Sequence, residues 1–94
     1  MNDNSSINAS QISPEDKQKA FFERARKGVL AHLNEKGGKL SLSEMHDYSL
    51  NKFFIQHQSF SRMMETFVEE GLLEFDNGTY TATITDAGRK FIEN

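Results

Sequence analysis

The chain has 94 residues, no cysteine and a formal net charge of −3 at pH 7. This length allows one small domain, and the absence of cysteine excludes disulfides, thiolate zinc sites and a cysteine nucleophile. No apolar run approaches the roughly 20 residues that a transmembrane helix needs, and residues 1–12 lack the basic start and apolar stretch of a secretory signal. We therefore expect a cytoplasmic protein without a membrane segment.

The N-terminal part of the chain predicts a tail followed by a long helix. Residues 1–12 are rich in Asn and Ser, so we expect a disordered tail in front of one domain over residues 13–94. In Ser13–Asp16 the serine can cap a helix, the proline suits its first position, and the acids favour the positive end of its dipole. Apolar residues recur at helical spacing until Gly37-Gly38, a typical helix end. These signals predict a helix over about residues 14–35.

The middle of the chain predicts a short strand and two further helices. Leu40–Leu42 alternates between apolar and polar residues and could form a small strand, after which Ser43 starts a second helix. A third helix is predicted over roughly Ser59–Glu70, ended by Gly71. Residues 50–58 could either extend the second helix or form an extended turn, and the sequence leaves both open.

The C-terminal part predicts a β-hairpin and a short last helix. Two strand candidates, Leu72–Phe75 and Tyr80–Ile84, flank the pair Asn77-Gly78. Asn-Gly is a strong hairpin signal because both residues accept the positive φ that a tight turn requires. Thr85 is then suited to cap a helix over Asp86–Ile92.

Three stretches, in this order, resemble parts of winged-helix transcriptional regulators, in particular the multiple-antibiotic-resistance and phenolic-acid regulator groups. LSLSEMHDYS (40–49) resembles the strand and first helix of the helix-turn-helix, SFSRMMETFVEEGLLE (59–74) its recognition helix, and YTATITDAGRKFIEN (80–94) the second wing strand with the helix after it. The resemblance implies an α+β winged-helix domain, in which a three-helix bundle carries a C-terminal β-hairpin wing and a short closing helix. From Ser41 to Gly71 the chain is a few residues longer than the family pattern, and the extra residues fall near Asn51–Gln56.

The resemblance implies a DNA-binding transcriptional regulator that forms a homodimer through its first helix. A helix-turn-helix lays its second helix in the major groove of double-stranded DNA, with the N-terminal residues of that helix at base edges. Gln can bond adenine in two places, Arg can bond guanine, Ser can reach bases or phosphates, and Lys can contact a phosphate. The residues predicted to bind DNA on this basis are Lys52, Gln56, His57, Gln58, Ser59, Ser61 and Arg62.

The distribution of charge supports a second hypothesis, a winged-helix module that binds another protein and not DNA. Residues 1–40 carry seven cations and five acids, a net +2, whereas residues 41–94 carry four cations and nine acids, a net −5. Affinity for DNA comes largely from neutralising phosphates. The predicted wing tip, Glu74–Tyr80, has two acids and no base, so it would weaken binding to DNA.

The cations of the first predicted helix have two possible interpretations. Lys17, Arg24 and Lys27 share one stripe of the helix, with Arg26 near it. The stripe could be an ordinary solvated face or part of a surface for a partner. Phe21 and Leu30 lie outside the main apolar stripe and could form a dimer contact or belong to the core.

The sequence does not predict an enzyme. It contains no glycine-rich phosphate loop and no nucleophile with a nearby base. His32, His46 and His57 are isolated, without the close pairs that metal sites need. We therefore expect neither a metal nor a cofactor.

Overall fold

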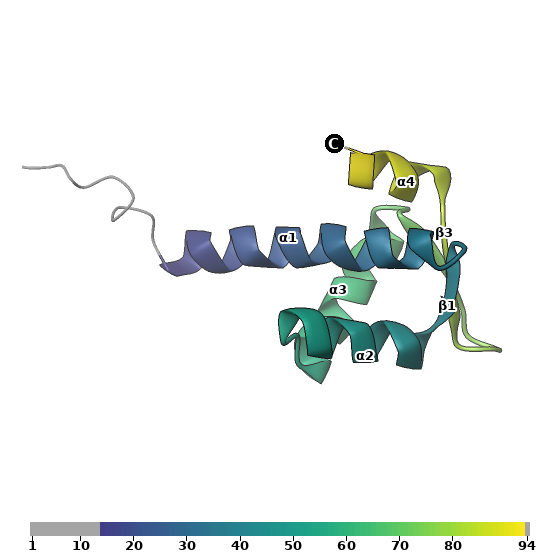
Figure 1. The fold of residues 1–94 in the computed structure, drawn as a ribbon, viewed down its shortest axis with the longest axis horizontal. Coiled ribbons are helices and arrows are strands. Elements are labelled where there is room, and N and C mark those ends of the chain that lie inside the picture. The colour runs from purple at the N-terminus through teal and green to yellow at the C-terminus, as the bar shows by residue number, and fades with distance from the viewer. Residues whose placement is uncertain (1–13, 94) are drawn as a thin grey trace, which may run out of the picture.

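Residues 14–93, which the computed structural model describes, form four helices and a three-stranded antiparallel sheet (Figure 1). The expectation of an α+β arrangement is confirmed. The predicted tail over residues 1–12 and the predicted cap Ser13 lie outside the described residues. In chain order the elements are α1 (Pro14–Glu35), β1 (Lys39–Ser41), α2 (Leu42–Phe53), α3 (His57–Glu69), β2 (Leu73–Asp76), β3 (Thr81–Ile84) and α4 (Asp86–Glu93).

Helix α1 has the predicted bounds and ends as expected. Gly37 and Gly38 both take positive φ, at 98° and 86°, and the N–H of Gly38 donates to the carbonyl of Leu33. Leu30 is fully buried, so it belongs to the core and its interpretation as a dimer contact is wrong. Phe21 is 42% exposed. It lies on the N-terminal part of α1, which extends beyond α2 and α3 (Figure 1).

Helix α2 begins at Leu42, one residue earlier than predicted. Its cap is Ser41, not Ser43, because the Ser41 hydroxyl accepts from the N–H of Glu44 while the Glu44 carboxylate accepts from the N–H of Ser41. This reciprocal pair is a capping box. The N–H and the hydroxyl of Ser41 both donate to the Glu44 carboxylate and hold the pKa of this carboxyl below its ordinary value, which keeps it charged at the positive end of the helix.

Residues 50–58 contain both a helix end and a turn. Helix α2 runs to Phe53, and Phe54 then takes the left-handed conformation with φ 59°. Its N–H donates to the carbonyl of Leu50, and the N–H of the buried Ile55 donates to that of Ser49. Helix α3 follows at His57, two residues before its predicted start.

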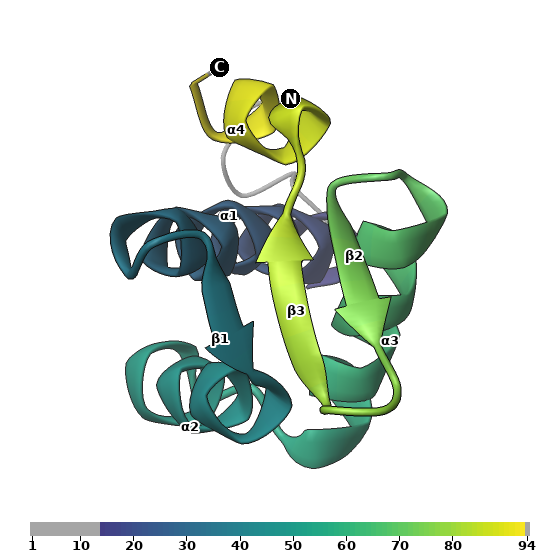
Figure 2. The same ribbon diagram turned by 90° about the vertical axis from the view of Figure 1, so that its right-hand side faces the viewer.

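The sheet has the order β1-β3-β2, so the last strand in the sequence is the central one (Figure 2). The hairpin is present, but its predicted turn is wrong. Residues 77–80 form a four-residue connection in which Tyr80 takes positive φ (55°), whereas Asn77 and Gly78 do not. The Asp76 carboxylate accepts from the N–H of Gly78 at 2.8 Å, so the aspartate side chain shapes this turn.

The core lies where α1, α2, α3 and the inner face of the sheet meet. Phe67, Leu33, Met45, Met63 and Leu73 are its largest fully buried apolar side chains, together with Leu30. Helix α4 packs against α1. No helix within residues 14–93 is long and apolar enough to cross a membrane.

Arg26 is part of this interior and not of a surface stripe. It is 4% exposed, and its guanidinium donates to Glu23 of α1 at 2.8 Å and to Glu70, after α3, at 2.6 Å. The guanidinium carbon lies 5.4 Å from the ring centre of Phe67 and 5.2 Å from that of Phe91. Burial opposes the charged form, but the two carboxylates outweigh it and raise the pKa of Arg26. The residue therefore ties α1, α3 and α4 together.

Candidate interaction surfaces

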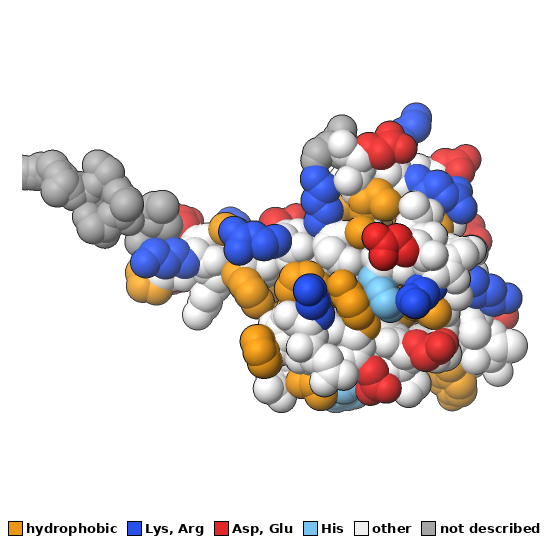
Figure 3. Space-filling view, in the orientation of Figure 1, with side chains coloured by type: hydrophobic (Ala, Val, Ile, Leu, Met, Phe, Trp, Pro, Cys, Tyr) orange, Lys and Arg blue, Asp and Glu red, His pale blue; other side chains and the backbone are white. Residues whose placement is uncertain are grey.

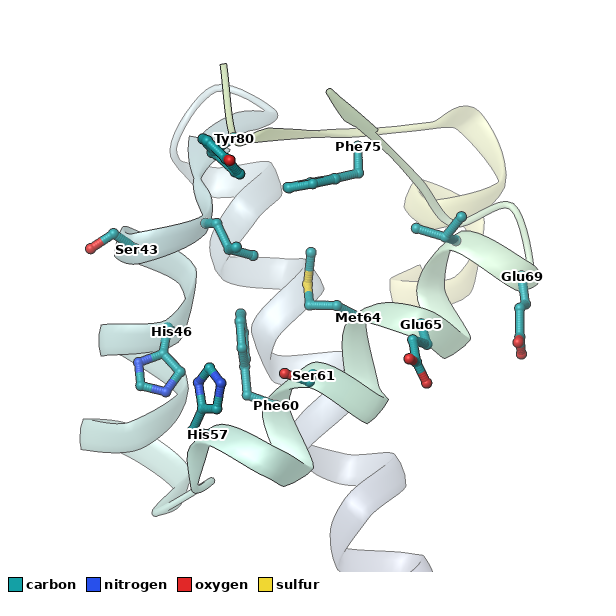
Figure 4. A pocket seen from close by; sticks show the side chains of 12 residues that line it. Ser43, His46, His57, Phe60, Ser61, Met64, Glu65, Glu69, Phe75 and Tyr80 are labelled. Atoms are coloured by element: carbon teal, nitrogen blue, oxygen red, sulfur yellow. The ribbon is translucent and has the colours of Figure 1, made fainter. Parts of the chain in front are cut away.

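An apolar groove of about 930 Å³ lies between α2, α3 and the β2–β3 hairpin. Figure 4 shows its side chains converging from these elements, with Phe60 and Met64 of α3 below Phe75 and Tyr80 of the hairpin. This volume lies within the range of pockets that bind ligands. We call it the apolar groove, and it is the first candidate site.

Exposed apolar side chains make the groove unusual for a small domain. Phe60 and Met64 are buried beneath it, but Val68 is 49% exposed and Tyr80 is 63% exposed. The left-handed backbone of Tyr80 turns its ring toward the groove, where the ring centres of Phe75 and Tyr80 are 6.5 Å apart. Clustered exposed apolar groups of this kind are typical of interaction surfaces.

One end of the groove carries two histidines. The rings of His46 on α2 and His57 on α3 are 5.5 Å apart in an edge-on arrangement, and the ring of Phe60 lies 5.0 Å from that of His46 (Figure 4). The Nε2 atom of His46 is buried and has no hydrogen-bond partner within residues 14–93. No group of three or more His, Asp or Glu side chains in that part of the chain could hold a metal ion.

The charges of the groove are negative. Glu65 and Glu69 of α3 line it, and neither Lys nor Arg does. The exposed acids Glu74 and Asp76 of the hairpin flank Phe75 in β2, so they point to the opposite face of the sheet and do not line the groove. The hydrogen bond from Gly78 lowers the pKa of the Asp76 carboxyl, so this charge persists to lower pH than that of an ordinary aspartate.

A second cleft, which we call the Phe54 cleft, lies between the projecting part of α1 and the turn from α2 to α3. Phe54 is 79% exposed there, beside Phe21 of α1. Figure 3 shows cations along α1 with apolar side chains next to them. The charged residues that line the cleft are Lys17, Lys19, Arg62 and Glu15.

All seven residues predicted to bind DNA are exposed, but they do not share one surface. His57 and Ser61 line the apolar groove, whereas Gln56, Ser59 and Arg62 line the Phe54 cleft. Lys52 and Gln58 line neither. Helix α3 thus presents two faces of different character, and the predicted set is divided between them.

The sequence interpretation missed the apolar members of both surfaces. Helical spacing alone does not separate the exposed Val68 from the buried side chains of the third helix, and residues 53–54 fall in the stretch for which the sequence leaves helix and turn open. One sequence feature does point to the exposed aromatic residue: near residues 51–56 the chain is a few residues longer than the family pattern. The longer turn carries an aromatic ring where a shorter turn would have none. Comparison of the chain with protein-family models, curated proteins and solved structures finds no match.

Proposed function

We propose that this chain is a winged-helix interaction module that binds a protein segment in the apolar groove between α2, α3 and the hairpin. The order of helices and strands supports the winged-helix assignment, with β2–β3 as the wing. The observation that carries the function is the character of the groove, where exposed apolar side chains lie beside glutamates and no cation is present.

The same observation weighs against DNA as the ligand of this face. In a helix-turn-helix the outer side of the second helix enters the major groove, between two phosphate backbones. Here that side of α3 carries Glu65, Val68 and Glu69. Between residues 42 and 84 the chain has two cations, Lys52 and Arg62. Each carboxylate near a phosphate subtracts from affinity that depends on neutralising phosphates.

The chemistry of the groove defines the segment it would bind. Apolar side chains would enter between Phe75, Tyr80 and Val68, where they remove exposed apolar surface from water. Lys or Arg residues flanking them would face Glu65 and Glu69, which adds complementarity at the rim. The expected ligand is therefore a basic, amphipathic segment of a protein.

Selection of displayed random peptides on the purified protein tests this proposal. We expect enriched peptides to combine apolar residues with Lys or Arg, and to shift the backbone NMR signals of α3 and the hairpin. Val68→Asp should abolish their binding, because it places a charge among the exposed apolar side chains that the ligand would cover. Glu35→Lys, at the exposed end of α1, is the matched control that should bind normally. Failure to enrich any peptide, or equal binding by Val68→Asp, would overturn the proposal.

DNA binding is the second candidate, favoured by the exposure of all seven predicted residues around the start of α3. Fluorescence anisotropy with labelled duplex DNA at low salt tests it, because phosphate contacts are strongest there. If Arg62 meets a base, Arg62→Ala should weaken binding by about 1–3 kcal/mol. Affinity that falls with added salt and with this substitution would replace the protein-binding proposal.

A further inference from the structure

We infer that the segment bound in the apolar groove belongs to a second copy of this chain, which inserts Phe54 and its basic surroundings head to tail. The inference rests on the proposed function, because it names the partner of the same groove. Its two halves are the Phe54 cleft on one copy and the apolar groove on the next.

Phe54 has two unfavourable features at one position. Its ring is 79% exposed, and its backbone is left-handed at φ 59°, a conformation that favours glycine. Both features are fixed by the hydrogen bonds from the N–H groups of Phe54 and Ile55 back to α2, and by the burial of Ile55. The backbone that carries the exposed ring is therefore held in a defined conformation, so that little backbone freedom is lost when a partner covers the ring.

The charges around Phe54 are mostly positive, opposite in sign to those of the groove. Lys17, Lys19 and Arg62 line the Phe54 cleft, with Glu15 as its one acid. The groove is lined by Glu65 and Glu69 without a cation. An aromatic ring surrounded by cations on one copy thus fits an apolar groove bordered by carboxylates on another, and the chain itself has the basic, apolar character expected of the ligand.

The positions of the two surfaces determine the kind of assembly. They lie on different faces of α3, with Arg62 in one and Glu65 in the other. A contact between them uses unlike patches of the two copies, so one end of the pair keeps an unbound Phe54 and the other end keeps an empty groove. Such a contact continues into a closed cyclic oligomer or a filament and does not stop at a symmetric dimer.

A complementation experiment tests the inference. Wild-type protein should show a mass that rises with concentration in analytical ultracentrifugation and falls again with added salt. Phe54→Asp removes the inserted ring, and Val68→Asp blocks the groove, so each variant alone should remain a monomer. An equimolar mixture of the two retains one intact ring and one intact groove, and it should form a particle of twice the monomer mass.

Phe54→Gly provides a second variant that is suited to the left-handed backbone. It should fold, as circular dichroism would show, and it should not associate. Glu35→Lys, away from both surfaces, should associate like the wild type.

Three results would overturn the inference: a monomeric wild type at all concentrations, a mixture of the aspartate variants that stays monomeric, or undiminished association of Phe54→Gly. The peptide-binding experiment separates failure of this inference from failure of the proposed function. If the wild type is monomeric but selected peptides still bind and Val68→Asp loses them, the groove binds a different protein. If the peptides also fail, the proposed function fails with the inference.

Discussion

Substitution of Gly88 by alanine tests the packing of α4, because two effects predict opposite signs. Alanine is the better helix former, and in the first turn of α4 it would stabilise the helix by at most about 1 kcal/mol on propensity alone. In the structure, however, a Cβ at this position would lie 2.1 Å from the carbonyl oxygen of Leu72 and 2.7 Å from Cγ1 of Ile84. Gly88 is buried, so the direct contact decides the outcome.

The magnitude follows from what must move. The Leu72 carbonyl would have to withdraw by about 0.9 Å to reach even a 3.0 Å contact. That carbonyl accepts from the N–H of Thr85 at 3.1 Å, so the movement would strain a hydrogen bond worth about 1 kcal/mol. Overpacking of a filled site costs about 1–3 kcal/mol. After subtraction of the propensity gain, we expect a net loss of about 2 kcal/mol, or roughly 8–16 °C in Tm for a domain of this size.

Thermal and urea unfolding followed by circular dichroism measure this effect. The matched control is Gly78→Ala, the same chemical change in the hairpin turn. There φ is not left-handed, and an added Cβ would meet Asp76 Oδ1 at 3.2 Å. The control should change stability by less than about 1 kcal/mol. If Gly88→Ala proves as stable as Gly78→Ala, the close approach of α4 to Leu72 is wrong.

Three further predictions concern the interior, one ionisable side chain and one helix cap. Arg26→Ala should destabilise the protein by about 2–4 kcal/mol in urea unfolding, as for other large-to-small core changes, because it leaves a cavity and releases Glu70; an effect below about 1 kcal/mol would contradict the buried position of Arg26. His32 stacks on Tyr48 at 3.7 Å between ring centres, and burial, aided by nearby Lys36, lowers its pKa from 6.5. Because of this shift, the unfolded chain takes up the proton on His32 at a higher pH than the folded chain does. The stability that the neutral imidazole contributes is therefore fully present above the ordinary pKa and is lost as pH falls through the pKa of the folded state. His32→Phe should therefore show a smaller fall of Tm between about pH 7.5 and pH 5.5 than the wild type, and parallel curves would contradict the shift. Ser41→Ala should cost about 1 kcal/mol through loss of the capping box, measured by urea unfolding, and an unchanged midpoint would show that Ser43 caps the helix instead.

The sequence predicts the elements well where local chemistry decides them. Pro14 at one end of α1 and Gly37-Gly38 at the other give both of its bounds, since each residue type has a strong local preference there. The sequence predicts less well where contacts with residues far along the chain decide whether a side chain is buried. Arg26 looks like a surface cation next to Glu23, and only contacts with residues far along the chain, such as Glu70 44 positions later, make it internal.

The hairpin and the second helix show how competing local signals mislead. Asn77-Gly78 predicts a tight turn with positive φ at both residues, but the carboxylate of Asp76 accepts from the N–H of Gly78 and the positive φ falls at Tyr80 instead. Ser41 and Ser43 are both possible caps, and the glutamate three residues after Ser41 selects the earlier one. The residues predicted to bind DNA are exposed near the start of α3, but their division between two surfaces depends on the turn at Phe54, which the sequence leaves open.

The strand order has a consequence for how the domain is made. Because β3 is the central strand, β1 and β2 have no sheet partner until Thr81–Ile84 is available. Lys39 pairs with Thr83, 44 residues later, so this pairing closes a long loop and slows folding relative to a purely helical bundle. In a nascent chain that has emerged only as far as the hairpin turn, residues 39–41 and 73–76 therefore have no strand to pair with, and the sheet can form only after residues 81–84 have emerged.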